Sequence, residues 1–333
     1  MDAWLHTFAF PHRVAELARR IEDWGYAGLL VADSQNLNAD VWVELALAGA
    51  ATERIGLGPG VTNPRTRHPA VTASAVATLQ AETGGRALLG LGRGDSALTQ
   101  IGQRPVSAAE LEDALVAVQG YLRGEEVELG GSSGRIRWLP DDTIPKVPVT
   151  VAATGPRVIA AAARHAEHID FTVGAEPARL RWAIEAAESA AEDRRPSLGA
   201  FLNVAVHPDR VVARDLVRGS VAIFARFATE GAPADGLSEV TRRGIDGLTA
   251  DYDEGRHGEG DAPHARRLED DFIDRFALVG TPDEVLERLA EIATLGVERV
   301  VLVPGSLDAD PALVAEANDL FAAEVLPHMS ALG

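Results

Sequence analysis

Hydrophobic and polar positions follow two alternating patterns along most of the chain. Between Pro11 and Trp24, apolar residues recur every three or four positions with charged residues between them, which predicts an amphipathic helix that Gly25 ends. The run GLLVAD after it, residues 28–33, is short and almost wholly apolar, as in a strand buried on both faces. A first strand precedes that helix and ends near His6, and similar runs recur between helical stretches at residues 55–60, 87–92, 147–153, 168–173, 200–206 and 297–303.

Eight apolar strands separated by helices predict a parallel sheet built through right-handed crossovers. Eight is the number at which such a sheet closes, so we expect an α/β fold of the (β/α)8 or TIM-barrel type, with an open doubly wound sheet as the alternative. Residues 209–271 hold no strong strand, and we predict that they form a helical insertion or lid before the last helix–strand unit. The 333 residues are therefore expected to form a single barrel domain, residues 1–333.

Charge and composition narrow the classes of partner. The chain carries 31 Lys and Arg against 50 Asp and Glu, a formal net charge of −19, which disfavours nucleic-acid and anionic-membrane partners. The absence of cysteine excludes thiolate chemistry, and no His and carboxylate spacing indicates a metal site. The first ten residues lack the pattern of a signal peptide, and no apolar run reaches the roughly 18 residues of a membrane span, so we expect a cytoplasmic protein.

The chemistry of a barrel of this kind lies where the strands end. Four strand ends carry unusual residues, namely Asp33-Ser34, GPGVTNP at 58–64, GRGDSA at 92–97 and ATGPR at 153–157. The Thr-Gly turn of ATGPR is followed by Pro at a helix start, which leaves backbone N–H groups and Arg157 to meet a phosphate. A plain helix start explains ATGPR equally well, and a tight turn capped by Asp95 is the alternative for GRGDSA.

Together these runs resemble a known family. The strand-three sequence, GGRALLGLGRGDSAL at 84–98, ATGPR and FALVGTPDEVLERL at 276–289 resemble the luciferase-like monooxygenase superfamily. They look closest to its deazaflavin-dependent branch, which includes methylenetetrahydromethanopterin reductases. The resemblance covers almost the whole chain and is weakest over residues 209–271.

This resemblance implies a barrel, a homodimer, a small-molecule substrate and a flavin-type cofactor, either coenzyme F420 (a deazaflavin) or FMN. The ring would lie against a strand-three bulge with a non-prolyl cis peptide at Gly60-Val61, and Thr62 would face its edge. The phosphate contacts would lie on the turns after strands four and five, with Val173 and Gly174 in the same pocket. The predicted cofactor-binding residues are Ser34, Gly60, Val61, Thr62, Gly92, Arg93, Gly94, Ala153, Thr154, Gly155, Pro156, Arg157, Val173 and Gly174.

The chain departs from the family after strand two. Deazaflavin enzymes of this kind often carry Asp-His there, whereas this chain has Asp33-Ser34, so the usual acid–base histidine is missing. The candidate catalytic residues are therefore Asp33 together with His6 and Asp95, which the strand ends place within reach of the ring. His6 could instead be a structural histidine at the barrel mouth, and Asp95 a helix cap.

Three functions remain open from the sequence. The first is hydride transfer between F420 and a small organic electrophile such as an imine or enone, which needs little acid–base apparatus because the cofactor carries the chemistry. The second is an FMN-dependent monooxygenase. The third is a non-catalytic flavin-binding homologue, which the missing histidine leaves open.

Overall fold

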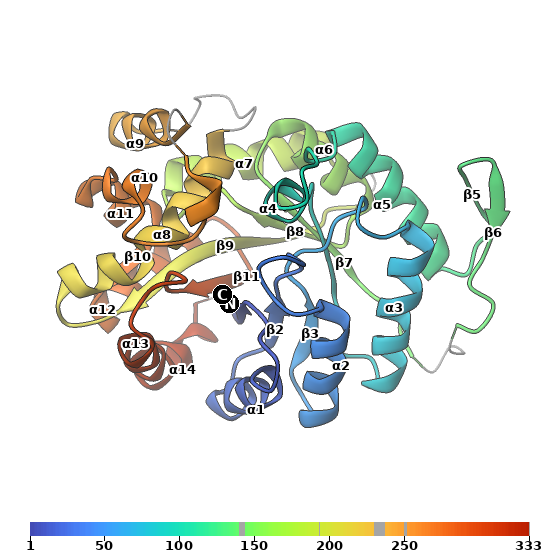
Figure 1. Cartoon of the computed structure of the whole chain (residues 1–333), viewed down its shortest axis with the longest axis horizontal. Coiled ribbons are helices and arrows are strands. Elements are labelled where there is room, and N and C mark those ends of the chain that lie inside the picture. Colours follow the sequence, from blue (N-terminus) through green and yellow to red (C-terminus); the bar gives the residue numbers. More distant parts are fainter. Residues whose placement is uncertain (140–143, 193, 230–236, 250–251, 333) are drawn as a thin grey trace.

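The predicted strands pair in parallel around a common axis. The computed structural model describes residues 1–139, 144–192, 194–229, 237–249 and 252–332. The pairing order is β3-β2-β1-β11-β9-β8-β7-β4, every neighbour parallel (Figure 1). The bounds are β1 (Asp2–Thr7), β2 (Gly28–Val31), β3 (Gly56–Pro59), β4 (Leu89–Leu91), β7 (Val149–Ala153), β8 (His168–Phe171), β9 (Ser197–Val206) and β11 (Arg299–Pro304).

The two ends of this order, β3 and β4, also meet. Isolated parallel bridges join Leu57 to Ala87 and Thr62 to Leu91, one on each side of a bulge. Backbones touch within the bulge: a Cβ on Gly58 would lie 2.0 Å from the Leu88 carbonyl oxygen. Glycine is required at such an approach because any side chain would separate the strands. The sheet therefore closes, which confirms the (β/α)8 class and excludes the open sheet.

Helices surround the strands on the outside (Figure 1). Several begin with Pro in the first turn, which suits a position whose N–H has no partner. Ser107 with Glu110 and Thr281 with Glu284 form capping boxes. The helices are α1 (Val14–Trp24), α2 (Val41–Ala51), α3 (Pro69–Glu82), α4 (Asp95–Thr99), α5 (Ala108–Leu122), α6 (Pro156–His165), α7 (Pro177–Ala190), α12 (Pro282–Ala293), α13 (Pro311–Glu324) and α14 (Leu326–Met329).

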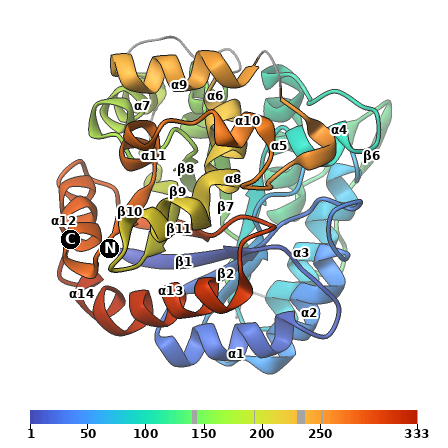
Figure 2. The same ribbon diagram turned by 60° about the vertical axis from the view of Figure 1, so that its left-hand side comes forward.

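The described part of the segment predicted as an insertion is helical. It contains α8 (Arg210–Thr229), α9 (Glu239–Thr249), the short η1 (Glu254–Arg256), α10 (Pro263–Arg266) and α11 (Asp270–Phe276), which lie together in Figure 2. Residues 230–236 and 250–251 of the predicted insertion lie outside the described residues. A short strand follows, β10 (Leu278–Gly280), which pairs with β9 and which the sequence did not predict because its apolar run is only three residues long.

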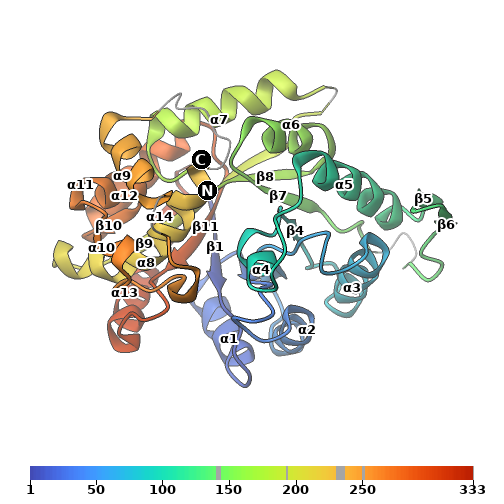
Figure 3. The ribbon, with the colours of Figure 1, turned by 45° about the horizontal axis from the view of Figure 1, so that its top comes forward.

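Other differences from the predicted elements are local. The stretch before β7 contains an antiparallel hairpin, β5 (Val127–Leu129) and β6 (Ser132–Gly134), which projects from the barrel in Figure 3. Several strands are shorter than their apolar runs; the run at 87–92, for example, contributes only Leu89–Leu91. No described helix is long and apolar enough to cross a membrane.

A buried ion pair fills the barrel near the start of its strands. The Arg299 guanidinium donates to both carboxylate oxygens of Asp170 at 2.8 Å, and the Thr150 hydroxyl donates to the same carboxylate at 2.7 Å. Asp170 is completely buried, so this charge is compensated only by these neighbours. The barrel interior is open at the opposite end, where the strands finish.

Candidate active site

A cavity of about 830 Å³ occupies the C-terminal end of the barrel. Its walls come from the ends of β1, β2, β3, β4, β7, β8 and β11, from Phe201 of β9 and from α8, with residues 257 and 258 at one side. Ligand sites in proteins commonly have volumes of roughly 300 to 1,000 Å³. The cavity is therefore large enough for a tricyclic ring together with a small substrate.

Most of the predicted site residues lie on this cavity. Those that line it are His6, Asp33, Ser34, Gly60, Val61, Gly92, Arg93, Gly94, Asp95, Thr154, Gly155, Pro156 and Arg157. These residues come from five strand ends, and the barrel brings them to one mouth. Their predicted roles stay predictions.

Four predicted residues do not line the cavity. Ala153 is buried between Ala152 and Thr154, which do line it, because successive strand residues point to opposite faces. Thr172 replaces Val173 and Gly174 in the lining, and its hydroxyl lies 2.6 Å from that of Thr154. Thr62 was expected to face the ring edge, but it is fully buried and its hydroxyl donates to Asp33.

The strand-three bulge has the predicted cis peptide between Gly60 and Val61. The Gly60 N–H donates to the Val31 carbonyl at 2.7 Å, which attaches the bulge to β2. A Cβ on Gly92 would lie 2.6 Å from a Val61 methyl carbon, so the Val61 side chain occupies the space that this glycine leaves. Val61 thus projects a small apolar surface into the cavity.

His6 supports the bulge from β1. Its Nε2 lies 2.7 Å from the Gly60 carbonyl oxygen, and because that oxygen can only accept, Nε2 must carry the hydrogen. Burial lowers the pKa of His6 to about 4, while the hydrogen bond to Gly60 partly opposes the effect of burial. The ring is therefore neutral near pH 7, with Nδ1 unprotonated. His6 can accept a hydrogen bond in the cavity, and it has a structural role as well.

Asp33 supports the bulge from the other side. Its carboxylate accepts the Thr62 hydroxyl at 2.6 Å and lies 3.6 Å from the Arg67 guanidinium. Burial raises the pKa of this carboxyl, and the Thr62 hydrogen bond and Arg67 limit the rise. Asp33 therefore orients Thr62 directly after the bulge.

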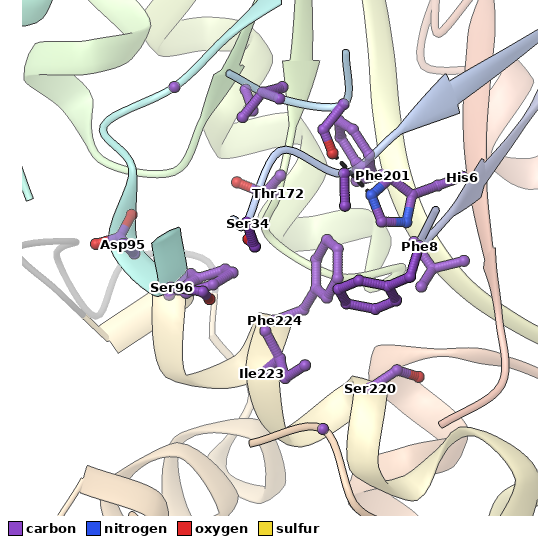
Figure 4. A pocket seen from close by; sticks show the side chains of 18 of the residues that line it. His6, Phe8, Ser34, Asp95, Ser96, Thr172, Phe201, Ser220, Ile223 and Phe224 are labelled. Carbon is purple, nitrogen blue, oxygen red and sulfur yellow. Dashed lines mark hydrogen bonds between the residues drawn. The ribbon is translucent and has the colours of Figure 1, made fainter. Parts of the chain in front are cut away.

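Asp95 begins α4 on the opposite wall. Gly94 precedes it with a φ of 80°, a left-handed conformation that suits glycine. Figure 4 shows Asp95 and Ser96 on one side of the cavity and His6 and Phe8 on the other. Asp95 is thus the first residue of α4 and not its cap, which is Gly94 and makes no side-chain cap hydrogen bond, and Asp95 faces the cavity.

An uncapped helix start with a cationic side chain lies at the beginning of α6. Gly155 is the N-cap and offers no side chain to the first turn, and Pro156 has no N–H, so the next N–H groups remain open. Arg157 lines the cavity, is exposed and forms no ion pair with a described residue. In a chain of net charge −19 this combination is well suited to a phosphate.

The apolar wall was not predicted from the sequence. It is formed by Phe8, Phe201, Ile223 and Phe224, and α8 carries the last two of these (Figure 4). The Phe201 ring packs edge-on against His6 with centroids 5.8 Å apart. The run AFLNVAV predicted a strand, but a strand buried on both faces shows no alternation from which the inward residue could be read.

Two polar residues of the lining, Ser96 and His257, were also missed. The Ser96 hydroxyl lies 2.9 Å from Nε2 of His257, and the Tyr252 hydroxyl lies 2.9 Å from Nδ1 of the same ring. His257 lies within residues 209–271, which were predicted only as a helical insertion or lid. Within the described residues no group of three or more His, Asp or Glu side chains is arranged to hold a metal ion.

The chain belongs to the luciferase-like monooxygenase family, whose sequence profile matches residues 2–299. The prediction of a luciferase-like oxidoreductase is thereby confirmed. The chain is similar to the 5,10-methylenetetrahydromethanopterin reductase of Methanopyrus kandleri, with 31% identity over 345 residues, covering 96% of this chain and 95% of the relative. It is 28% identical over 354 residues to the phthiodiolone/phenolphthiodiolone dimycocerosates ketoreductase of Mycobacterium tuberculosis, covering 96% of this chain and 87% of the relative.

Solved structures share the fold. The F420-dependent tetrahydromethanopterin reductase from Methanopyrus kandleri superposes with a TM-score of 0.75 at 24% identity, covering 98% of this chain and 99% of the other. An F420-dependent secondary alcohol dehydrogenase in complex with an F420-acetone adduct gives 0.72 at 19% identity, covering 98% of both chains. The oxygenating constituent of 3,6-diketocamphane monooxygenase from Pseudomonas putida, in complex with FMN, gives 0.66 at 19% identity with 98% coverage of both.

Proposed function

We propose that the protein transfers a hydride between coenzyme F420 and a small organic electrophile. The observation that carries this proposal is a single cavity that joins an open helix start with Arg157 to a glycine bulge and an apolar aromatic wall. Such a cavity suits a ligand with a phosphate at one end and a planar ring at the other. The F420-dependent reductase and the F420-dependent alcohol dehydrogenase that share the fold favour F420 as that ligand.

The residues present fit the cofactor. The backbone of Gly60-Val61 would lie against the ring, and the N–H groups after Thr154-Gly155, with Arg157, would hold the phosphate. Arg93 lines the same end, and its Nε donates to the Val106 carbonyl at 2.7 Å, which holds the turn after β4 in place. The bound deazaflavin would supply or accept the hydride, and the protein would orient the substrate and exclude water.

The substrate end of the cavity favours a neutral, mainly apolar molecule. The Ser220 hydroxyl donates to the Val217 carbonyl and the Ser306 hydroxyl to the Leu216 carbonyl, so both hydroxyl hydrogens are engaged within the protein. The aromatic wall offers dispersion contacts and no ionic partner. We propose an imine, enone or ketone, whose polar atom would face the groups near Asp95 and Ser96.

FMN-dependent monooxygenation is the second candidate, because the same open helix start would accept the FMN phosphate and an FMN enzyme shares the fold. Titration of the apoprotein with F420 and with FMN, followed by fluorescence quenching, separates the two. Tight binding of F420 and oxidation of reduced F420 by cyclohex-2-enone or an aryl ketone would support hydride transfer. Preference for FMN with oxygen-dependent turnover would support the monooxygenase. Binding without turnover would indicate a non-catalytic homologue.

We further propose that the protein is a cytoplasmic homodimer that binds no nucleic acid. The outer face of α2 exposes Val43 and Leu47, and α3 beside it exposes Val71, at 59%, 50% and 54% of their surface. An exposed apolar helix face is typical of an interaction surface, and a second copy of the chain would bury it. Light scattering of the Leu47→Glu variant tests this: the variant should be monomeric and the parent dimeric.

A further inference from the structure

A chain of three side chains runs from the cavity wall into the segment between α9 and α11. The Ser96 hydroxyl lies on the cavity, Nε2 of His257 follows at 2.9 Å, and the Tyr252 hydroxyl lies 2.9 Å from Nδ1. The His257 side chain is 3% exposed and also lines the cavity. The loop is fixed by the Leu307 N–H, which donates to the Gly258 carbonyl at 2.9 Å.

The surroundings of His257 keep its imidazole neutral. Burial is the largest cause that lowers its pKa, to about 4, and the Arg226 guanidinium and His264 act in the same direction. The Glu254 carboxylate lies 3.8 Å from Nδ1 and forms an ion pair with Arg226. A neutral imidazole donates a hydrogen bond from one ring nitrogen and accepts one at the other. In either tautomer His257 therefore accepts from one of its two neighbours, Ser96 and Tyr252, and donates to the other.

Two other titratable groups on the cavity, His6 and Asp33, are poorly placed to donate a proton. His6 is neutral, and its N–H is already directed to the Gly60 carbonyl. The carboxylate of Asp33 is occupied by the Thr62 hydroxyl. Ser96 lies on the wall opposite His6 (Figure 4), with a partner behind it that can replace its proton.

We propose that Ser96, His257 and Tyr252 form a proton relay that supplies or removes the substrate proton accompanying hydride transfer. This inference rests on the proposed function. A carbonyl that gains a hydride from the reduced deazaflavin gains two electrons and becomes an alkoxide, which needs one proton to become the alcohol. An enone passes through an enolate with the same requirement.

In the reducing direction each group passes one proton and receives one. The Ser96 O–H bond breaks as its proton moves to the substrate oxygen, Nε2–H transfers to the Ser96 oxygen, and the Tyr252 O–H transfers to Nδ1. Tyr252 is left as a phenolate until solvent returns the proton. Burial raises the pKa of Tyr252 and disfavours that charge, and the Arg226 guanidinium, 4.6 Å from the ring centroid, partly opposes the effect of burial. With the imidazole in its other tautomer, the same chain removes a proton from an alcohol.

Three variants interrupt the relay at successive points: Ser96→Ala, His257→Gln and Tyr252→Phe. The matched control is Gln100→Leu, because the Gln100 side-chain amide also joins α4 to the loop, donating to the Glu254 carbonyl at 3.3 Å, but carries no transferable proton. The probes are F420 and cyclohex-2-enone. The measurements are the F420 dissociation constant, kcat, KM and the solvent deuterium isotope effect on kcat.

We expect kcat to fall by about 100-fold in Ser96→Ala and by about tenfold in Tyr252→Phe, in the range of general acid catalysis, with KM and F420 binding changed less than about twofold. The isotope effect should rise in the variants because proton delivery becomes slow, and Gln100→Leu should resemble the parent. In the apoprotein, nitrogen NMR should show a neutral His257 above pH 5 whose tautomer ratio changes in Tyr252→Phe.

Equal losses in Ser96→Ala and Gln100→Leu would overturn the relay and leave a contact that only closes the cavity. A large loss in Asp95→Asn with an active Ser96→Ala would also overturn it, with Asp95 as the donor. A parent protein that binds F420 and reduces no electrophile would overturn the proposed function and the relay together. An active parent with unaffected relay variants would overturn the relay alone.

Discussion

Replacement of Arg157 by Ala should weaken the binding of F420 without unfolding the protein. Arg157 is exposed at the start of α6, makes no ion pair with a described residue and borders the cavity. Its removal leaves no buried partner unsatisfied, so we expect a loss of cofactor affinity with little change in stability. A hydrogen bond to a charged group contributes roughly 1.5 to 3 kcal/mol.

Solvent screening at this exposed position places the loss of binding free energy near the lower limit, about 1.5 kcal/mol. This corresponds to a roughly tenfold higher dissociation constant. Fluorescence quenching of F420 measures it directly, and the difference between parent and variant should shrink as salt is raised. Arg164→Ala is the matched control, because Arg164 is at the far end of the same helix and its guanidinium pairs with Glu112 at 2.6 Å. Identical titration curves for Arg157→Ala and the parent would refute the assignment of the phosphate to this turn.

Three further changes test the scaffold of the site. Gly92→Ala places a methyl group 2.6 Å from a Val61 methyl carbon and should destabilise the fold by about 1 to 3 kcal/mol in urea unfolding. The pKa of His6 is about 4 in the folded protein and 6.5 for an ordinary histidine, so its contribution to stability is complete above pH 6.5 and is lost as the pH falls towards 4. The His6→Gln variant should therefore lose up to about 3 kcal/mol less stability than the parent over this pH range. Arg299→Met leaves the Asp170 carboxylate unpaired and should cost about 3 to 5 kcal/mol.

Each scaffold prediction has its own control. Gly247→Ala, where an added Cβ meets no atom within 4 Å, should leave stability unchanged or raise it slightly. An equally steep loss of stability in parent and His6→Gln between pH 6.5 and 4 would assign the acid sensitivity to other groups. Joint replacement of Arg299 and Asp170 by apolar residues should recover most of the loss, and failure to recover it would show that the pair is not the cause.

The barrel could be predicted because each of its strands and helices is indicated by a short, local stretch of the sequence. A short apolar run between helices indicates a strand wherever it occurs, and eight such runs indicate closure. The ends of the strands were less predictable, since glycines such as Gly92 belong to the apolar run but lie outside the hydrogen-bonded strand. Side-chain direction was also not available: Ala153 was expected in the site, whereas its neighbours Ala152 and Thr154 line it.

A binding role could be proposed from the residues alone where one segment carries both the turn and the candidate ligand group. ATGPR contains its glycine, its proline and its arginine within five residues, so a phosphate site could be inferred before the fold was known. The contact between Ser96 and His257 joins residues 161 positions apart. Neither a spacing rule nor local periodicity predicts such a pair, because the two residues meet only when α8 to α11 pack over the mouth of the barrel.

The position of the cavity walls along the chain has a consequence for how such enzymes diversify. The bulge and the turns after β4 and β7 all precede α7, whereas Phe201, α8 and the loop with His257 all follow it. A single genetic crossover between two relatives, in the connection that follows Ala190, would exchange most of the proposed substrate wall and keep the proposed cofactor-binding segments of one parent. Recombination at one point could therefore create a new substrate preference in a barrel that still binds its original coenzyme.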